Sequence, residues 1–194
     1  MTLEIEKIYN DSEELKNIFN YLDSLEIEYR KQYKGMYGRT MSVPRGQASF
    51  TLTPDIHYDY KVSGGSPPNK VMCNKLKEIT EKVNKTFNTN YNTILMNVYK
   101  DGEDCIGFHR DKTNGWAENS GFCTLSFGAE RDFIIRKIDN INDKQSIIHE
   151  NGMAINMPYP MNDIYHHSVP KRKKIKDTRI SLTFREIIDK IKNK

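Results

Sequence analysis

The segment Arg179-Ile-Ser-Leu-Thr-Phe-Arg185 alternates polar and apolar side chains from end to end. A period of two is typical of a β-strand, because successive side chains point to opposite faces. The four polar side chains therefore share one face: Arg179, Ser181, Thr183 and Arg185. Such a face is either the ordinary solvent side of an antiparallel strand or a binding surface for a dicarboxylate, because guanidinium groups bind carboxylates through two parallel hydrogen bonds.

Short apolar runs separated by turn signals precede this segment. They predict strands at Thr93–Tyr99, Phe122–Phe127, Phe133–Ile138, Ser146–His149, Ala154–Met157 and Ile164–Val169, with Ile180–Phe184 as the seventh. The turn signals between them include Asp101-Gly102 and Asn151-Gly152. Seven short strands at such intervals favour an antiparallel sandwich or a jelly roll.

Two helices are predicted before these strands. Asp11 is a suitable N-cap, and apolar residues at helical spacing follow it, so a first helix should run from about residue 12 to 24. Pro67-Pro68 should open a second helix whose apolar stripe runs from Met72 to Phe87. Residues 29–66, rich in glycine and proline, predict short strands and turns. The fold class is thus α+β, with helices supporting an all-β core.

Length and composition indicate one compact domain. The 194 residues carry 30 basic and 26 acidic side chains, and the mean hydropathy is −0.75. Nearly cancelling charges exclude the strong net charge of disordered chains, and no run of 18 apolar residues predicts a spanning helix. The three cysteines are too few for a disulfide scaffold, and the acidic start lacks the features of a signal peptide. We expect a monomer with no membrane partner, in a reducing intracellular compartment, the nucleus or the cytoplasm.

The charge is unevenly distributed along the chain. Residues 1–28 carry 8 acidic and 2 basic side chains, whereas residues 161–194 carry 10 basic and 4 acidic ones. The basic end indicates either a surface for a polyanion or an ordinary solvated segment.

The pair His109 and Asp111 is the strongest chemical signal in the chain. Alternate residues of an extended segment point to the same side, so these two side chains should converge while Arg110 points away. His167, 56 residues after Asp111, would add a second imidazole from a distant strand. Two imidazoles and one carboxylate leave positions open on a metal, as Fe(II) oxygenases require. By itself, a histidine and an aspartate at this spacing are more often a surface pair.

Several motifs then stand in a characteristic order. They are Asn97-Val-Tyr99, Ile106-Gly-Phe-His109-Arg-Asp111, Leu125-Ser-Phe-Gly-Ala-Glu-Arg-Asp-Phe133, His167-Ser-Val-Pro170 and Arg179-Ile-Ser-Leu-Thr-Phe-Arg185. In this order and spacing the chain resembles the AlkB family of Fe(II)/2-oxoglutarate-dependent dioxygenases that dealkylate nucleic acids, and it looks closest to the animal nuclear DNA-repair members. Ser42-Val-Pro-Arg45 and Tyr60-x-x-Ser63-Gly64 extend the resemblance over roughly residues 35–188.

The resemblance implies both a fold and a reaction. The fold is a double-stranded β-helix, a jelly-roll variant. Its parts would be an N-terminal helical segment (residues 1–28), a nucleotide-recognition lid (29–66), and a support helix with the dioxygenase core (67–194). The reaction is oxidative dealkylation of N-alkylated bases in DNA, of the 1-methyladenine and 3-methylcytosine type. It is coupled to decarboxylation of 2-oxoglutarate to succinate with O2, and it repairs alkylation damage.

The resemblance also assigns site residues. Fe(II) would be held by His109, Asp111 and His167, while His166 alternates to the other face. The positions matching the 2-oxoglutarate site are Asn97, Tyr99, Arg179, Ser181, Thr183 and Arg185. Among these, Arg179 matches the arginine that binds the distal carboxylate, and Asn97 and Arg185 match groups near the metal.

A further set of residues would face the nucleic acid: Tyr37, Arg45, Tyr60, Val62, Arg110, Thr113, Lys171, Arg172, Lys173 and Lys174. Tyr37 stands where related enzymes carry a wedge that fills the gap left by a flipped base. Arg45 and the run Lys171–Lys174 would contact phosphates. Val62 and Thr113 depart from the family, which has an aromatic and an acidic residue at these places, so base selectivity stays open.

Three functions are compatible with these features. The first is a dealkylase of duplex or single-stranded DNA, and the second is a demethylase of RNA or of single strands. The third is a protein hydroxylase or a weakly active nucleic-acid-binding module, which the intact His109, Asp111 and His167 disfavour. Cys105 and Cys123 show no zinc-binding spacing, so we expect them in the core.

Overall fold

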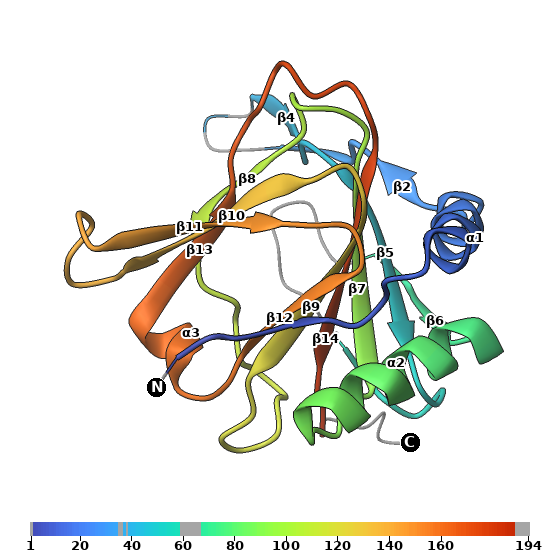
Figure 1. The fold of residues 1–194 in the computed structure, drawn as a ribbon. Helices are drawn as coiled ribbons and strands as arrows, with labels where there is room; N and C mark the ends of the chain where they lie inside the picture. Colours follow the sequence, from blue (N-terminus) through green and yellow to red (C-terminus); the bar gives the residue numbers. More distant parts are fainter. Residues whose placement is uncertain (1, 35–36, 38, 59–66, 189–194) are drawn as a thin grey trace.

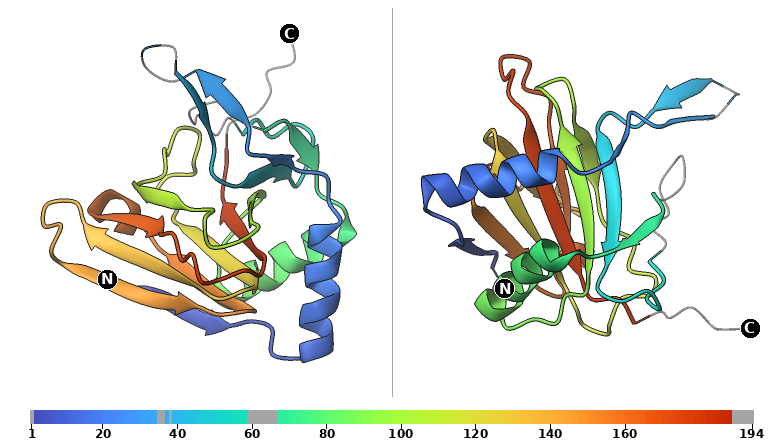
Figure 2. Two further views of the ribbon diagram at one scale, coloured as in Figure 1. Left: turned by 90° about the horizontal axis from the view of Figure 1, so that it is seen from above. Right: turned by 90° about the vertical axis from the view of Figure 1, so that its right-hand side faces the viewer.

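Two β-sheets lie face to face, and two helices cover the outer side of the larger sheet (Figures 1 and 2). The computed structural model describes residues 2–34, 37, 39–58 and 67–188. The helices are α1 (Ser12–Asp23) and α2 (Asn74–Phe87). Within the described ranges, no helix is both long and apolar enough to cross a membrane. The paired sheets confirm the predicted jelly-roll core.

The larger sheet has eight strands in the order β1-β12-β9-β14-β7-β5-β2, with β6 beside β5. Their bounds are β1 Glu4–Lys7, β2 Glu28–Tyr29, β5 Gly46–Thr51, β6 Asn69–Val71, β7 Thr93–Tyr99, β9 Phe122–Gly128, β12 Met153–Met157 and β14 Arg179–Arg185. β14 pairs antiparallel with β7 on one side and β9 on the other over its whole length. The last strand of the described residues therefore lies at the centre of the sheet.

The smaller sheet has the order β11-β10-β13-β8. Its strands are β8 Ile106–His109, β10 Arg131–Lys137, β11 Lys144–His149 and β13 Tyr165–Val169, and a short helix, α3 (Met161–Ile164), leads into β13. A separate hairpin of β3 (Gln32–Lys34) and β4 (Thr40–Ser42) stands away from both sheets (Figure 2).

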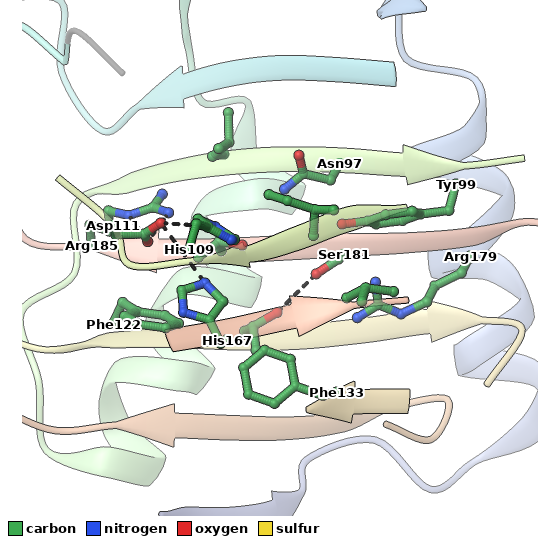
Figure 3. Close-up of a pocket in the computed structure, with 15 residues that line it drawn as sticks. Asn97, Tyr99, His109, Asp111, Phe122, Phe133, His167, Arg179, Ser181 and Arg185 are labelled. Atoms are coloured by element: carbon green, nitrogen blue, oxygen red, sulfur yellow. Dashed lines mark hydrogen bonds and ion pairs between the residues drawn. The ribbon is translucent and has the colours of Figure 1, made fainter. Parts of the chain in front are cut away.

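The two faces of β14 have different surroundings. Ile180, Leu182 and Phe184 belong to the buried cluster that the two helices form with the larger sheet. The polar residues of β14 are also buried, and they line a pocket on the opposite face (Figure 3). The interpretation of this polar face as a solvent side is therefore wrong.

Apolar side chains from both sheets fill the space around that pocket. Phe122 and Ile155 come from the larger sheet, and Phe133 and Val169 come from the smaller one. Because this cluster excludes water from most of the interface, polar groups in it need partners within the protein or on a ligand.

The second helix begins later than predicted. Asn69–Val71, directly after the proline pair, form β6 and pair parallel with β5, so α2 starts only at Asn74. The Ser49 hydroxyl donates to the Asn69 side-chain oxygen at 2.7 Å, and this pairing with β5 outweighs local helix propensity.

Two segment assignments also differ from the structure. β1, which the sequence pattern did not predict, is the edge strand of the larger sheet and lies within the N-terminal segment expected to be helical. β5, inside the expected lid of residues 29–66, pairs with β7 and is part of the core. Cys123 is buried as expected, but Cys105 is only half-buried.

Candidate functional site

A pocket between the two sheets collects all nine of the predicted metal and co-substrate residues (Figure 3). β7 contributes Asn97 and Tyr99, and β14 contributes its four polar residues. The smaller sheet adds His109 from β8 and His167 from β13, and Asp111 lies two residues after the end of β8. Residues separated by up to 88 positions in the sequence, from Asn97 to Arg185, thus face one cavity.

His109, Asp111 and His167 form a compact cluster. Each offers one ligand atom, and these atoms all lie within 4.8 Å of one another. Asp111 Oδ1 is 3.5 Å from His109 Nε2 and 3.9 Å from His167 Nε2. The strand register explains the meeting, because His167 is the direct pairing partner of His109 between β13 and β8. His166, on the other face of β13, is not part of the cluster.

The protonation states of the cluster suit a metal cation. Burial alone would raise the pKa of Asp111, but Arg185 and the two histidines reverse this and hold the pKa below its usual value. Arg185 donates to Asp111 Oδ2 from Nη2 at 2.5 Å and from Nε at 3.1 Å. Burial and the nearby His109 lower the pKa of His167 to about 3, so its imidazole is neutral at neutral pH.

Some acceptor atoms of the cluster are not used in hydrogen bonds within the described part of the protein. His109 Nδ1 lies 2.9 Å from the carbonyl oxygen of Gly107, which can only accept, so Nδ1 carries a proton, and in a neutral imidazole the lone pair is then on Nε2. Asp111 Oδ1 is buried and accepts no hydrogen bond from any described residue. Two imidazole nitrogens and one carboxylate oxygen fit a divalent transition metal with open positions.

Arg179 lies in the same pocket and is almost completely buried. Its Nε donates to Ser126 Oγ at 2.8 Å, and its guanidinium lies 5.2 Å from the centre of the Tyr99 ring. Burial lowers the pKa of Arg179 to about 10, which still leaves the group charged at neutral pH. Nη1 is buried and has no hydrogen-bond partner among the described residues. A buried cation with an unused donor fits an anionic ligand.

The other co-substrate candidates surround these groups. Ser181 Oγ lies 2.8 Å from Thr124 Oγ1, and Thr183 lies two residues further along the same face of β14. Asn97 Oδ1 accepts from Arg45 Nε at 2.8 Å and from Gln47 at 3.1 Å. Both lone pairs of Asn97 Oδ1 are thus occupied, which leaves its NH2 group as the donor available to the pocket.

The nucleic-acid candidates are not brought together in the same way. Tyr37 is 94% exposed between β3 and β4, and Arg110 and Thr113 are exposed beside the metal cluster. Tyr60 and Val62 lie outside the described residues. Arg45 contradicts the expected phosphate contact, because it is only 5% exposed and its side chain is bonded to Asn97.

The basic run at residues 171–174 is exposed but largely ion-paired. Lys171 lies 3.1 Å and Lys173 lies 3.7 Å from Glu103 carboxylate oxygens. Arg172 donates to Asp132 at 2.6 Å. Phosphate contacts by these three side chains stay a prediction, and they would compete with carboxylates already in place.

Sequence reasoning missed Asn162, which holds the backbone of a candidate metal ligand. Its Oδ1 accepts from the Asp111 N–H at 2.9 Å, and its Nδ2 donates to the Asp111 carbonyl at 3.0 Å. Asn162 lies in α3, 51 residues away, and a single asparagine after a proline-rich turn gives no signal of this role. The amide fixes Asp111 at the point where β8 has ended.

Asn162→Ala should therefore weaken metal binding. Losing both bonds frees the Asp111 backbone, and we expect the affinity for Fe(II), measured by calorimetry under nitrogen, to fall about 10- to 100-fold. Asn92→Ala is the matched control, because Asn92 holds the backbone of Ile187 through the same two bonds, at 2.9 Å each. Equal Fe(II) affinity in the two variants would contradict this role of Asn162.

Comparison with known proteins identifies the class that this fold and site define. The family model described as "2OG-Fe(II) oxygenase superfamily" matches residues 3–185. The chain belongs to this superfamily and, within it, to the AlkB family. It is 35% identical over 188 residues to the DNA oxidative demethylase ALKBH2 of Homo sapiens, an alignment covering 90% of this chain and 69% of that protein. The resemblance seen in the sequence motifs is thus confirmed.

Two further similarities define the extent of the match. The ALKBH2 protein of Bos taurus is also 35% identical over 188 residues, but the aligned part is 90% of this chain and 65% of that protein. The chain therefore spans about two thirds of the length of these relatives. The solved structure of OsALKBH1 matches with a TM-score of 0.65 at 14% identity, covering 95% of this chain and 97% of that one, which supports the fold alone.

Proposed function

We propose that this protein oxidatively removes alkyl groups from damaged DNA bases, using Fe(II), 2-oxoglutarate and O2. The observation that carries the proposal is the single pocket in which a His109/Asp111/His167 cluster and the buried cation Arg179 face each other. DNA is the substrate favoured by the similarity to the ALKBH2 demethylases.

The proposed roles follow from the donor atoms of each residue. His109, Asp111 and His167 would hold Fe(II), which supplies oxygen chemistry that protein side chains lack. Arg179 Nη1 would bind the distal carboxylate of 2-oxoglutarate, with Tyr99, Ser181 and Thr183 beside it. Asn97 and Arg185 would shape the metal end of the co-substrate site, and Arg185 would keep Asp111 ionised.

The overall reaction balances without any other reductant. 2-Oxoglutarate loses CO2 and becomes succinate, which keeps one oxygen atom of O2. The second oxygen atom enters the C–H bond of the N-alkyl carbon. The resulting hemiaminal breaks its C–N bond, so the base regains its nitrogen proton or lone pair and an aldehyde leaves. The base must first leave the helix, which costs a few kcal/mol and is easiest for a damaged pair.

A direct assay tests this proposal. Purified protein with Fe(II), ascorbate and 2-oxoglutarate is incubated with oligonucleotides carrying 1-methyladenine or 3-methylcytosine, as single- and double-stranded DNA and as RNA. We expect unmodified base and succinate to form in equal amounts on DNA. Turnover on RNA alone would support the RNA demethylase instead. Loss of 2-oxoglutarate without any restored base on any of the oligonucleotides would contradict nucleic-acid dealkylation.

Tyr37→Ala should reduce activity on duplex DNA more than on the same single strand. A wedge matters only when a base pair must be opened and the gap filled. A stacking contact is worth about 1–3 kcal/mol, or roughly five- to a hundredfold. Steady-state rates on paired and unpaired substrates measure the difference. Tyr33→Ala is the control within the same hairpin, since Tyr33 is half-buried in β3. A uniform loss on both substrates by Tyr37→Ala would contradict the wedge.

A further inference from the structure

His149 is a buried, titratable side chain to which the proposed reaction gives no direct role. It ends β11, is completely buried, and packs edge-on against Phe133 with 6.0 Å between ring centres. Its Nε2 lies 3.0 Å from the carbonyl oxygen of Met153, and its Nδ1 lies 3.0 Å from Arg179 Nη2. It therefore connects the end of β11 with both β12 and β14.

The chemistry of its two partners fixes the tautomer of His149. A carbonyl oxygen only accepts, so Nε2 must carry the proton and donate to Met153. A guanidinium only donates, so Nδ1 must hold the lone pair and accept from Arg179. Both contacts require the same neutral imidazole. Burial and the charge of Arg179 also lower the pKa of His149 well below its usual value, which keeps the ring neutral.

Two of the three guanidinium nitrogens of Arg179 have hydrogen-bond acceptors among the described residues, and the third does not. Nε donates to Ser126 and Nη2 donates to His149, so two nitrogens of the planar guanidinium are tied to fixed acceptors. Nη1, the third nitrogen, is the one without a described partner. Because the group is planar and rigid, holding two of its corners sets the direction of the third.

We propose that His149 is a positioning residue that aims Arg179 Nη1 at the distal carboxylate of the co-substrate. The inference rests on the proposed use of 2-oxoglutarate, and it deepens that proposal by naming the group that sets co-substrate affinity. His149 does this through the lone pair on Nδ1, and its contact with Met153 only holds the ring in place.

Two substitutions separate these contacts. In His149→Asn the side-chain oxygen takes the place of Nδ1 and still accepts from Arg179. In His149→Gln the amide nitrogen takes the place of Nε2 and still donates to Met153, but Arg179 Nη2 loses its acceptor. His149→Leu, of similar size, removes both contacts and serves as the second variant if His149→Gln fails to fold, as judged by thermal unfolding.

The test compares two keto acids that share the 2-oxo acid group and differ only at the distal end. Binding of 2-oxoglutarate and of 2-oxopentanoate, which has a methyl group in place of the distal carboxylate, is measured by calorimetry. The protein is loaded with Fe(II) under nitrogen, so the readout does not depend on turnover. We expect His149→Gln to weaken 2-oxoglutarate about ten- to a hundredfold and to leave 2-oxopentanoate unchanged. His149→Asn should retain most of the wild-type preference.

Each of the other possible outcomes would contradict a specific part of the proposal. If wild type binds both keto acids equally, Arg179 does not bind the distal carboxylate, and the proposed co-substrate site fails. If wild type prefers 2-oxoglutarate but His149→Gln and His149→Leu keep that preference, the role of His149 is wrong. An equal loss for both keto acids, or an equal loss in His149→Asn and His149→Gln, would show that His149 is merely structural.

Discussion

His109→Ala should abolish Fe(II) binding and dealkylation while leaving the protein folded. The variant removes one of the three proposed ligands. Loss of a residue that only supports a ligand typically lowers metal affinity about 10- to 100-fold, so loss of a ligand itself should lower Fe(II) affinity by more than about a hundredfold. The His109 side chain is 26% exposed and takes part in no buried ion pair with Arg185, so its loss should lower stability by only about 1 kcal/mol. Fe(II) calorimetry and thermal unfolding measure the two effects separately.

Asp111→Ala should differ from His109→Ala in stability, and the comparison of the two variants is the control. Sequence reasoning alone suggests that any ligand can be removed without harm to the fold. Asp111 is, however, the buried ion-pair partner of Arg185, and removing one member of a buried ion pair costs about 3–5 kcal/mol of stability. The same stability in both variants would contradict the importance of that pair, and dealkylation by purified His109→Ala would refute the ligand assignment.

Arg179→Lys should raise the concentration of 2-oxoglutarate needed for turnover by about 30- to 150-fold. Lysine keeps the charge, but a single ammonium group cannot donate to Ser126 and His149 in fixed directions while also presenting a planar donor to a carboxylate. Losing a charge-assisted hydrogen bond costs about 2–3 kcal/mol, which gives the stated range. The KM for 2-oxoglutarate measures the effect.

Oligonucleotide affinity is the control for this variant. Arg179 is 1% exposed and lies inside the pocket, so binding of a methylated duplex should not change. An unchanged KM for 2-oxoglutarate would remove Arg179 from the co-substrate site. A KM effect accompanied by an equal loss of duplex affinity would indicate general damage to the fold.

Local pattern accounts for much of the predicted architecture. β7, β9 and β14 lie within a residue or two of the predicted runs, because alternation and β-branched residues are direct consequences of strand geometry. α1 spans Ser12–Asp23, close to the predicted 12–24, and Asp11 accepts from the Glu14 N–H as a capping residue should. The members of the His109/Asp111/His167 cluster could also be named in advance, from the spacing of His109 and Asp111 together with the family resemblance around His167.

Pairing between distant segments was not predictable in the same way. β1 is only four residues long, all of them exposed, and it exists because β12 offers it an edge. β6 replaces the first turns of a predicted helix because β5 supplies a parallel partner. Arg45 is basic and follows a proline, so its sequence suggests a surface contact. It lies directly before β5, however, and because β5 pairs with β7 its side chain reaches Asn97.

The sequence by itself thus determined the two long helices, seven of the core strands and which residue types could hold a metal and a dicarboxylate. Only the tertiary structure decided that the polar face of β14 lies in the interior, that Asn162 holds Asp111, and that His149 accepts from Arg179. The physical reason is that the alternation of side chains along a strand divides them between two faces but does not indicate which face is buried. Hydrogen bonds between residues 30 to 51 positions apart exist only once the two sheets have closed on each other.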